Sequence, residues 1–156
     1  MSRPPTRIAI MVSGQGRGTN MQAIIDACAS GKINGEVVLV IGVKDDAPAM
    51  ERARSVGVKT LTISPKDYAT ADDYDNAIFQ ALADHRVDLI CLAGYMRVLG
   101  AKIVERWRNR IMNVHPALIP RQHPLAAVND VYNAIYVTGD AVGDAMFYGR
   151  GAGQMP

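Results

Sequence analysis

The sequence lacks most of the features that mark specialised classes of protein. Two cysteines, Cys28 and Cys91, occur far apart in 156 residues, which argues against a disulfide framework or a zinc knuckle and favours two small core residues. No apolar run approaches the roughly 20 residues that a membrane-spanning helix needs. Residues 1–6 lack the apolar stretch of a secretory signal peptide. These absences predict a cytoplasmic protein that uses no metal and binds no membrane.

An excess of charge of one sign is also missing. Lys and Arg together number 17 and Asp and Glu together number 15, and a net charge of +2 does not predict a nucleic-acid partner. Hydrophobic residues make up 49% of the chain, so it can bury a sizeable core. Because the length is that of one ordinary domain, we expect residues 1–156 to fold as a single domain.

The first two-thirds of the chain alternates between strand and helix patterns. Five apolar runs predict buried strands, at residues 7–12, 37–41, 59–63, 89–93 and 110–114. Four segments between them predict helices, at residues 21–29, 48–55, 71–85 and 102–107. Strands that are apolar throughout and alternate with helices indicate a parallel sheet covered on both faces. We therefore predict a three-layer α/β/α fold with a mostly parallel, Rossmann-like sheet.

The pattern changes after Pro120. Residues 133–138 and 145–148 predict two strands around a glycine-bounded loop, which is typical of a β-hairpin. Such a hairpin could cover the edge of the sheet next to residues 110–114. If its apolar residues stay uncovered, they favour pairing with a second copy of the chain, so a homodimer through this edge hairpin is a predicted assembly.

A glycine-rich loop follows the first predicted strand. Gly14, Gly16 and Gly18 allow the backbone to approach a ligand closely, and the helix behind them offers free N–H groups to a phosphate. Thr19 or Asn20 could cap that helix and also contact the phosphate. A tight turn without a ligand is the alternative. The loop lacks the Gly-Lys-Ser/Thr of a P-loop and fits the dinucleotide-binding pattern poorly.

A second polar motif closes the fifth predicted strand. Asn113 and His115 are separated by one residue, so their side chains point to the same side of the strand, and Pro116 restricts the backbone at His115. An amide donor beside an imidazole could stabilise an oxyanion while the imidazole moves a proton. The alternative is a histidine that only closes the strand through a backbone hydrogen bond.

Three motifs in order resemble one family, phosphoribosylglycinamide formyltransferase. They are SG followed by NMQAI at residues 13–24, AGYMRVL at residues 93–99 and MNVHPALIP at residues 112–120. The resemblance implies transfer of a formyl group from 10-formyltetrahydrofolate to the amine of glycinamide ribonucleotide. It also implies three groups of site residues: Gly18, Thr19 and Asn20 for the substrate phosphate, Met96, Arg97, Val98 and Leu99 for the folate pterin, and Asn113 and His115 for catalysis.

The likeness to that family weakens after Pro120, and residues 122–156 resemble a fragment of homoserine dehydrogenase. We therefore expect a chimera, with a formyltransferase-like part at residues 1–121 and a dehydrogenase-like part at 122–156, made of a short helix at 124–130 and the hairpin. The family's catalytic aspartate would fall at Gly139, so Asp140 stands one residue late and Asp144 is a weaker candidate.

Three functions remain open from the sequence. The first is a formyltransferase whose activity is reduced because the orienting aspartate is displaced. The second is a folded chimeric scaffold without turnover, which we rank slightly higher. The third is an NAD-binding module, which only the glycines and the C-terminal fragment favour.

Overall fold

The computed structural model describes residues 4–114, 132–139 and 143–150, with only the backbone described for Val114 and the last two segments. The chain divides into two compact units, Met1–Asn113 and Val114–Pro156. The first unit alternates strands and helices in chain order: β1 Thr6–Val12, α1 Thr19–Ala29, β2 Gly35–Gly42, α2 Pro48–Ser55, β3 Thr60–Thr62, α3 Ala71–Asp84, β4 Leu89–Ala93, α4 Ala101–Arg106 and β5 Ile111–Val114.

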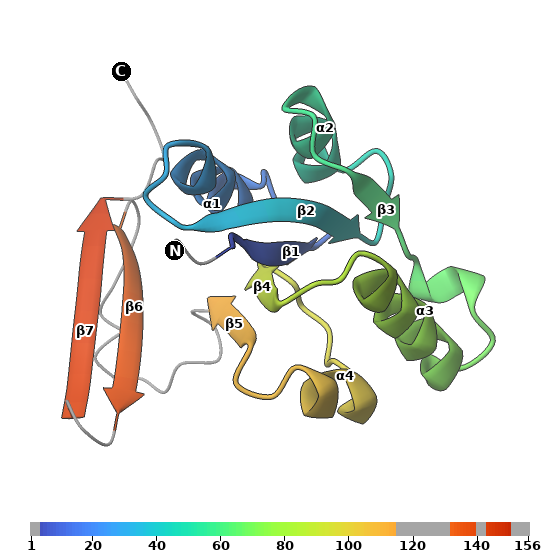
Figure 1. Ribbon diagram of the computed structural model, residues 1–156. Coiled ribbons are helices and arrows are strands. Elements are labelled where there is room, and N and C mark those ends of the chain that lie inside the picture. The colour runs from blue at the N-terminus through green and yellow to red at the C-terminus, as the bar shows by residue number, and fades with distance from the viewer. Residues whose placement is uncertain (1–3, 115–131, 140–142, 151–156) are drawn as a thin grey trace. The chain divides into compact units, whose positions relative to one another are not determined.

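The strands form one five-stranded sheet in the order β3-β2-β1-β4-β5 (Figure 1). β1 lies at the centre and pairs in parallel with both β2 and β4, and β2 pairs in parallel with β3. The backbone N–H of Ile90 donates to the carbonyl of Arg110, just before β5, at 2.9 Å. The prediction of a mostly parallel sheet is therefore confirmed.

Each face of the sheet carries its own apolar core. Along β1, Ile8, Ile10 and Val12 pack with residues of α1 and α2, while Ala9 and Met11 pack with residues of α3 and α4. This division follows from the alternation of side chains along a strand. Figure 1 shows α1 and α2 on one side of the sheet and α3 and α4 on the other. The three-layer α/β/α arrangement is confirmed.

The largest side chain of the core between the sheet and α3 and α4 is held by a hydrogen bond as well as by packing. Trp107 is 2% exposed, its Nε1 donates to the carbonyl of Val87 at 2.8 Å, and its ring meets Phe79 edge-on at 5.5 Å. Satisfying the indole N–H removes the cost of burying it. Trp107 therefore joins the end of α4 to α3 and to the approach to β4.

Most predicted segments correspond to the observed elements within two residues at each end. The predicted helix 48–55 and strand 89–93 match α2 and β4 at both ends. The helix predicted to start at residue 21 starts at Thr19, and the one predicted to end at residue 85 ends at Asp84, with His85 as its C-cap. Among the described residues, the 3₁₀ turn Pro65–Asp67 was not predicted.

The second unit contains two antiparallel strands, β6 Tyr132–Gly139 and β7 Gly143–Arg150. Their register pairs Ile135 with Phe147 and Gly139 with Gly143, so both strands are longer than predicted. The placement of this hairpin at the sheet edge stays a prediction. So does the organisation as one domain made of a part at 1–121 and a part at 122–156. The predicted helix at 124–130 lies outside the described residues.

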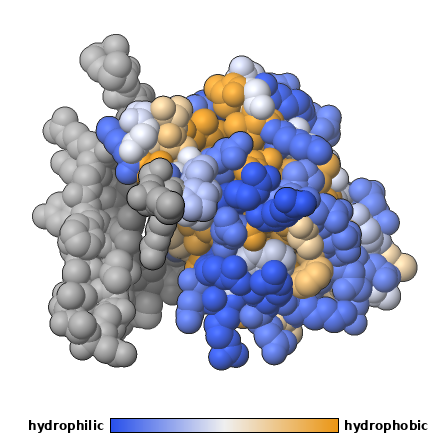
Figure 2. Space-filling model, viewed as in Figure 1, coloured by the Kyte–Doolittle hydropathy of each residue, from blue (hydrophilic) through white to orange (hydrophobic). Residues whose placement is uncertain are grey.

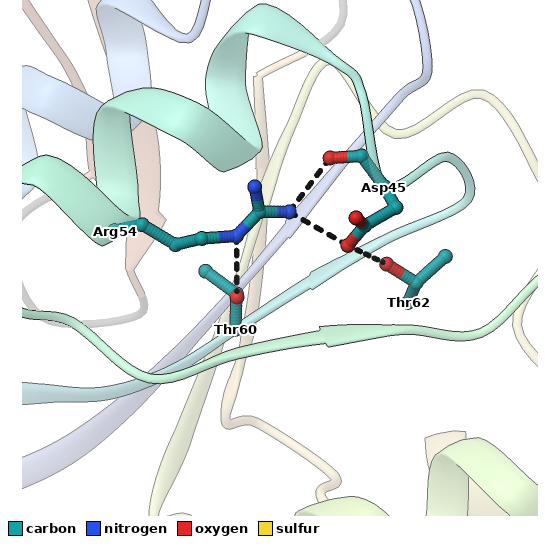
Figure 3. A network of polar contacts seen from close by, with 4 residues as sticks. All are labelled: Asp45, Arg54, Thr60 and Thr62. Atoms are coloured by element: carbon teal, nitrogen blue, oxygen red, sulfur yellow. Dashed lines mark hydrogen bonds and ion pairs between the residues drawn. The ribbon is translucent and has the colours of Figure 1, made fainter.

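A polar network joins the turn after β2 to α2 and β3 (Figure 3). The Arg54 guanidinium donates to the carbonyl oxygen of Asp45 at 2.6 Å, to its carboxylate at 2.7 Å and to the Thr60 hydroxyl at 3.2 Å. The Thr62 hydroxyl donates to the same carboxylate at 3.1 Å. One guanidinium thus holds three consecutive elements together near the carboxyl end of β2.

Hydrophilic residues cover much of the face seen in Figure 2, with hydrophobic residues between them. The large hydrophobic residues that are exposed among those described are scattered over the first unit: Ile33, Val56, Met96, Val98, Val104 and Met112. Within the described ranges, no helix combines the length and the apolar character needed to cross a bilayer.

Candidate active site at the carboxyl edge of the sheet

The motifs singled out in the sequence follow the carboxyl ends of three strands. The glycine-rich loop follows β1, residues 94–100 follow β4, and Asn113 lies on β5. β1 and β4 are neighbours, with Val12 beside Ala93, and the strand order runs outward from this pair in both directions. In open α/β sheets, ligands bind at such a switch point, beyond the carboxyl ends of the strands. The topology therefore brings the first two motifs to the switch point and the third one strand away.

Gly18 is the N-cap of α1, which corrects the prediction that Thr19 or Asn20 caps this helix. Gly18 adopts the left-handed conformation, with φ 75°, and no side chain caps the helix. The first helical hydrogen bond runs from Gln22 N to Gly18 O at 2.8 Å. Thr19 and Asn20 occupy the first two helical positions, so their side chains do not serve as caps. Their backbone N–H groups precede the first helical hydrogen bond, as an anion site requires.

The glycines of this loop also allow neighbouring residues to come close. A Cβ on Gly18 would lie 2.9 Å from the Cβ of Ala49 in α2, and one on Gly14 would lie 3.1 Å from the side-chain carbons of Lys44. A larger residue at either position would push α2 or the Lys44 stem away from the loop. Close packing between α1 and α2 thus requires glycine at position 18.

Residues 96–99 present an exposed, partly apolar surface. Val98 is 90% exposed and Met96 is 69% exposed, whereas Leu99 packs against the core of the α3 and α4 face. Gly94 before them has φ 76°, and Gly100 after them is the N-cap of α4. The exposed carbons of Met96 and Val98 could contact a flat heteroaromatic ring, while Leu99 anchors the segment.

Two tyrosines that are not among the predicted site residues hold this segment. The hydroxyls of Tyr74 in α3 and Tyr95 lie 3.0 Å apart, and both side chains are buried. Burial first, and then the hydrogen bond with Tyr74, raise the pKa of Tyr95. The Arg97 guanidinium lies over the Tyr74 ring, 5.2 Å from its centre. A sequence signal was available, because Tyr95 lies inside the AGYMRVL motif and Tyr74 lies on the same face of the predicted helix 71–85 as Ile78, four residues later.

Asn113 is exposed on β5, next to the half-exposed Met112, so its amide is accessible from solvent. The other two predicted catalytic residues, His115 and Asp140, lie outside the described residues. Asp144 belongs to β7, where it pairs with Thr138. The roles of Asn113, His115 and Asp140 therefore stay predictions.

Neither cysteine belongs to this site. Cys28 and Cys91 are free thiols, and both contribute to the core between the sheet and α1 and α2. Burial raises the pKa of both, that of Cys91 to about 11. The prediction of a core residue is confirmed for Cys91, whereas Cys28 is partly buried against the same core. In the described part of the chain, no three His, Cys, Asp or Glu side chains cluster in a way that could hold a metal ion.

The arrangement defines a class: a doubly wound α/β protein whose glycine-rich helix N-terminus and exposed apolar segment meet at the switch point of the sheet. The family model described as "Formyl transferase" matches residues 6–142. The chain belongs to the formyl transferase family. The matched residues extend beyond the joint that we expected near residue 121.

Known proteins agree with this assignment. The chain is 44% identical over 123 residues to the trifunctional purine biosynthetic protein adenosine-3 of Drosophila melanogaster, covering 78% of this chain and 9% of that protein. It is 40% identical over 129 residues to the phosphoribosylglycinamide formyltransferase of Haemophilus influenzae, covering 83% of this chain and 58% of that enzyme.

A solved structure gives the same picture. The glycinamide ribonucleotide transformylase 1 of Symbiobacterium toebii superposes with a TM-score of 0.69 at 42% identity, covering 74% of this chain and 53% of that one. The chain thus spans little more than half the length of these two single-function relatives.

Proposed function

We propose that this chain carries the core of a glycinamide ribonucleotide formyltransferase, which moves a formyl group from 10-formyltetrahydrofolate to the amine of the ribonucleotide. The observation that carries the proposal is the convergence of the three motifs at one edge of the sheet, two of them beside the switch point between β1 and β4. The names of the relatives supply the substrate, and the exposed segment 96–99 suits the flat ring of a folate.

The proposed binding roles follow from these positions. The N–H groups of Gly18, Thr19 and Asn20, at the start of α1, would hold the phosphate of the ribonucleotide, where the helix dipole favours negative charge. Met96, Arg97, Val98 and Leu99 would hold the pterin ring of the donor. These assignments place the amine and the formyl group beyond the carboxyl ends of β1, β4 and β5.

The chemistry would be addition to the formyl carbon followed by elimination. The substrate amine attacks the formyl carbon, and the amide of Asn113 donates a hydrogen bond to the oxyanion that forms. His115 moves the proton that the amine loses toward N10 of the folate, and the bond from N10 to the formyl carbon breaks. Asp140 would orient or charge His115. No metal enters this scheme.

The assay is formyl transfer, followed by the absorbance of the released folate. We expect turnover in the wild-type chain, and replacement of one oxyanion donor in Asn113→Ala should reduce it by about 10²–10³-fold. His115→Ala is the second control. If the wild-type chain melts cooperatively but is no faster than both variants, the chain is the alternative we described, a folded scaffold without turnover.

A chimeric origin for residues 122–156 rests on their residue pattern alone. The family match to residue 142 opposes a joint near residue 121. Comparing thermal unfolding of residues 1–121 with that of the full chain tests whether the second part is integral. A grafted part should change the melting temperature by only a few degrees, and a native part should be needed for folding.

The NAD-binding alternative finds no support at β2. The Asp45 carboxylate, the first acidic group after this strand, already accepts from Arg54 and Thr62 rather than facing a ribose. A calorimetric titration with NAD should show no heat of binding. Saturable binding in the micromolar range would instead revive this alternative.

A further inference from the structure

The segment from Gly94 to Gly100 contacts the beginning of α3 at several points, although about 20 residues of chain separate them. Tyr74, Asp75 and Asn76 are consecutive residues of α3, and each contacts the segment or the helix that follows it. A Cβ on Gly100 would collide with the Asp75 carboxylate, so glycine is required there. The Lys102 ammonium donates to the side-chain oxygen of Asn76 at 3.2 Å.

The central contact is the hydroxyl pair of Tyr74 and Tyr95. The two oxygens are 3.0 Å apart, and the side chains are 4% and 3% exposed. One hydroxyl donates and the other accepts, so neither is left unsatisfied in an apolar core. Removing either oxygen would leave the other hydroxyl without its buried partner, which costs more than the net gain from the bond itself.

The Tyr74 ring supports a second part of the segment. The Arg97 guanidinium lies 5.2 Å from the centre of that ring, in the geometry of a cation–π contact. The Tyr68 ring, which precedes α3 in the chain, meets the Tyr74 ring edge-on, with the two ring centres 5.9 Å apart. Tyr74 therefore contacts both Tyr95 and Arg97, the residues on either side of Met96.

The start of α3 is a firm base for these contacts. Thr70 caps the helix by accepting from the backbone N–H of Asp73 at 3.1 Å, and its own hydroxyl donates to the Asp73 carboxylate at 2.7 Å. This reciprocal arrangement places Tyr74 at a defined position in the first turns of the helix. The backbone position of Tyr74 is therefore set within α3 itself.

We propose that Tyr74 and Tyr95 are positioning residues, whose hydroxyl pair sets the backbone path of residues 96–99 and thereby directs Met96 and Val98 toward the ring of the formyl donor. Tyr74 does not contact the donor in this proposal and acts through Tyr95 and Arg97. The donor part of the inference rests on the proposed function. The control of the segment by the tyrosine pair does not.

The first experiment measures hydrogen–deuterium exchange of the full chain and needs no ligand. Tyr74→Phe and Tyr95→Phe each remove one hydroxyl and keep the ring. We expect the amides of residues 95–99 to exchange at least about fivefold faster in either variant, because an unpaired buried hydroxyl costs more than the net value of one neutral hydrogen bond. The amides of β1 should not change. The double variant should be no faster than the single variants, because all three lack the same bond.

Tyr68→Phe is the matched control. It removes a hydroxyl from a ring that packs against Tyr74, but it leaves the hydrogen bond between Tyr74 and Tyr95 intact. Equal acceleration in this control, or unchanged exchange in both Tyr74→Phe and Tyr95→Phe, would overturn the proposal. The melting temperature of each variant shows whether it is folded, and Tyr95→Phe serves as the test if Tyr74→Phe unfolds.

The second experiment measures binding of 10-formyltetrahydrofolate and, separately, of glycinamide ribonucleotide by calorimetry. We expect Tyr74→Phe to weaken the donor Kd about fivefold and to change the ribonucleotide Kd by less than twofold. Equal weakening of both ligands would indicate a general structural role and would contradict the donor part. If the wild-type chain binds no donor but hydrogen–deuterium exchange changes as expected, the tyrosine pair does position residues 96–99 and the proposed function is wrong.

Discussion

Single residues in this protein have roles that depend on backbone conformation as much as on side-chain chemistry. Gly18 is the clearest case, because its φ of 75° starts α1 and its missing Cβ admits Ala49 and Met21. A helix normally begins with a capping side chain. Here the position is given to a glycine, which leaves the N-terminal N–H groups of α1 without a side-chain cap.

We expect Gly18→Ala to reduce the free energy of unfolding by about 2 kcal/mol, because an L residue at positive φ is strained and its Cβ would crowd α2. Urea denaturation measures the change. Gly16→Ala is the control, since its Cβ would meet only the Ser13 hydroxyl at 3.5 Å. A loss at position 16 equal to that at position 18 would show that loop entropy, not the left-handed conformation, controls stability.

The buried thiol of Cys91 predicts a specific dependence on pH. Burial raises its pKa from 9.0 to about 11, so the native state retains the proton after the unfolded state has lost it. The stabilisation is therefore fully present below pH 9 and is lost as the pH rises to 11. Cys91→Ala lacks this term, so its stability deficit relative to wild type should shrink by about 2 kcal/mol over that range.

Urea titrations of both proteins at several pH values between 8 and 11 provide the measurement. Taking the difference between the two proteins cancels the titration of lysines and tyrosines that they share. A deficit that stays constant with pH would mean that the Cys91 thiol ionises in the native state as easily as in the unfolded chain.

At the scale of elements, the ordering of helices and strands around the switch point depends on polar contacts as well as on the core. The Arg54 guanidinium holds the turn after β2, α2 and β3 through Asp45, Thr60 and Thr62 (Figure 3). Val43 and Lys44 of the same turn lie against Gly14. The network therefore supports one side of the glycine-rich loop.

We expect Arg54→Ala to lower the free energy of unfolding by about 1 kcal/mol, a modest value because the Asp45 side chain is largely exposed to solvent and the Arg54 side chain is partly exposed. Chemical denaturation at low salt and at 1 M salt measures it, and salt should reduce the difference. Arg52→Ala on the same helix is the control and should cost less than about 0.5 kcal/mol. Equal losses in both variants would indicate the loss of a basic side chain from the last turn of α2, and not of the network.

The elements themselves were largely predictable. Strands such as Leu89–Ala93 are apolar along their whole length, and α2 begins at a proline and has its small buried residues on one face. The helix start at Thr19 was not predicted, because a polar residue was expected at the cap and the structure has a glycine there. β6 and β7 were found from their apolar pattern, but their full length depends on the pairing between them.

At the scale of the whole molecule, the second unit raises the question of assembly. We infer a homodimer in which the hairpin formed by β6 and β7 pairs with another copy, because an open strand edge favours such pairing. Light scattering over a wide concentration range should show a mass that rises toward that of a dimer. Val137→Lys should reduce this association, whereas Asn133→Lys, at a position that is already polar, should not. A monomer at every concentration would rule out the dimer.

The sequence by itself determined the alternation of strands and helices, the presence of a covered parallel sheet, and the three motifs that point to formyl transfer. These properties are local, since the period of apolar residues and the residue types in a turn depend on near neighbours in the chain. The sequence also predicted that each of the three motifs lies at the carboxyl end of a strand.

Only the tertiary structure decided which distant residues meet. It joined Tyr74 to Tyr95, Gly14 to Lys44 and Arg54 to Asp45, and it placed both cysteines in the same core. Such contacts depend on the order of strands in the sheet and on how each helix crosses it. Periodicity cannot specify these, because many chain paths bury the same apolar faces equally well.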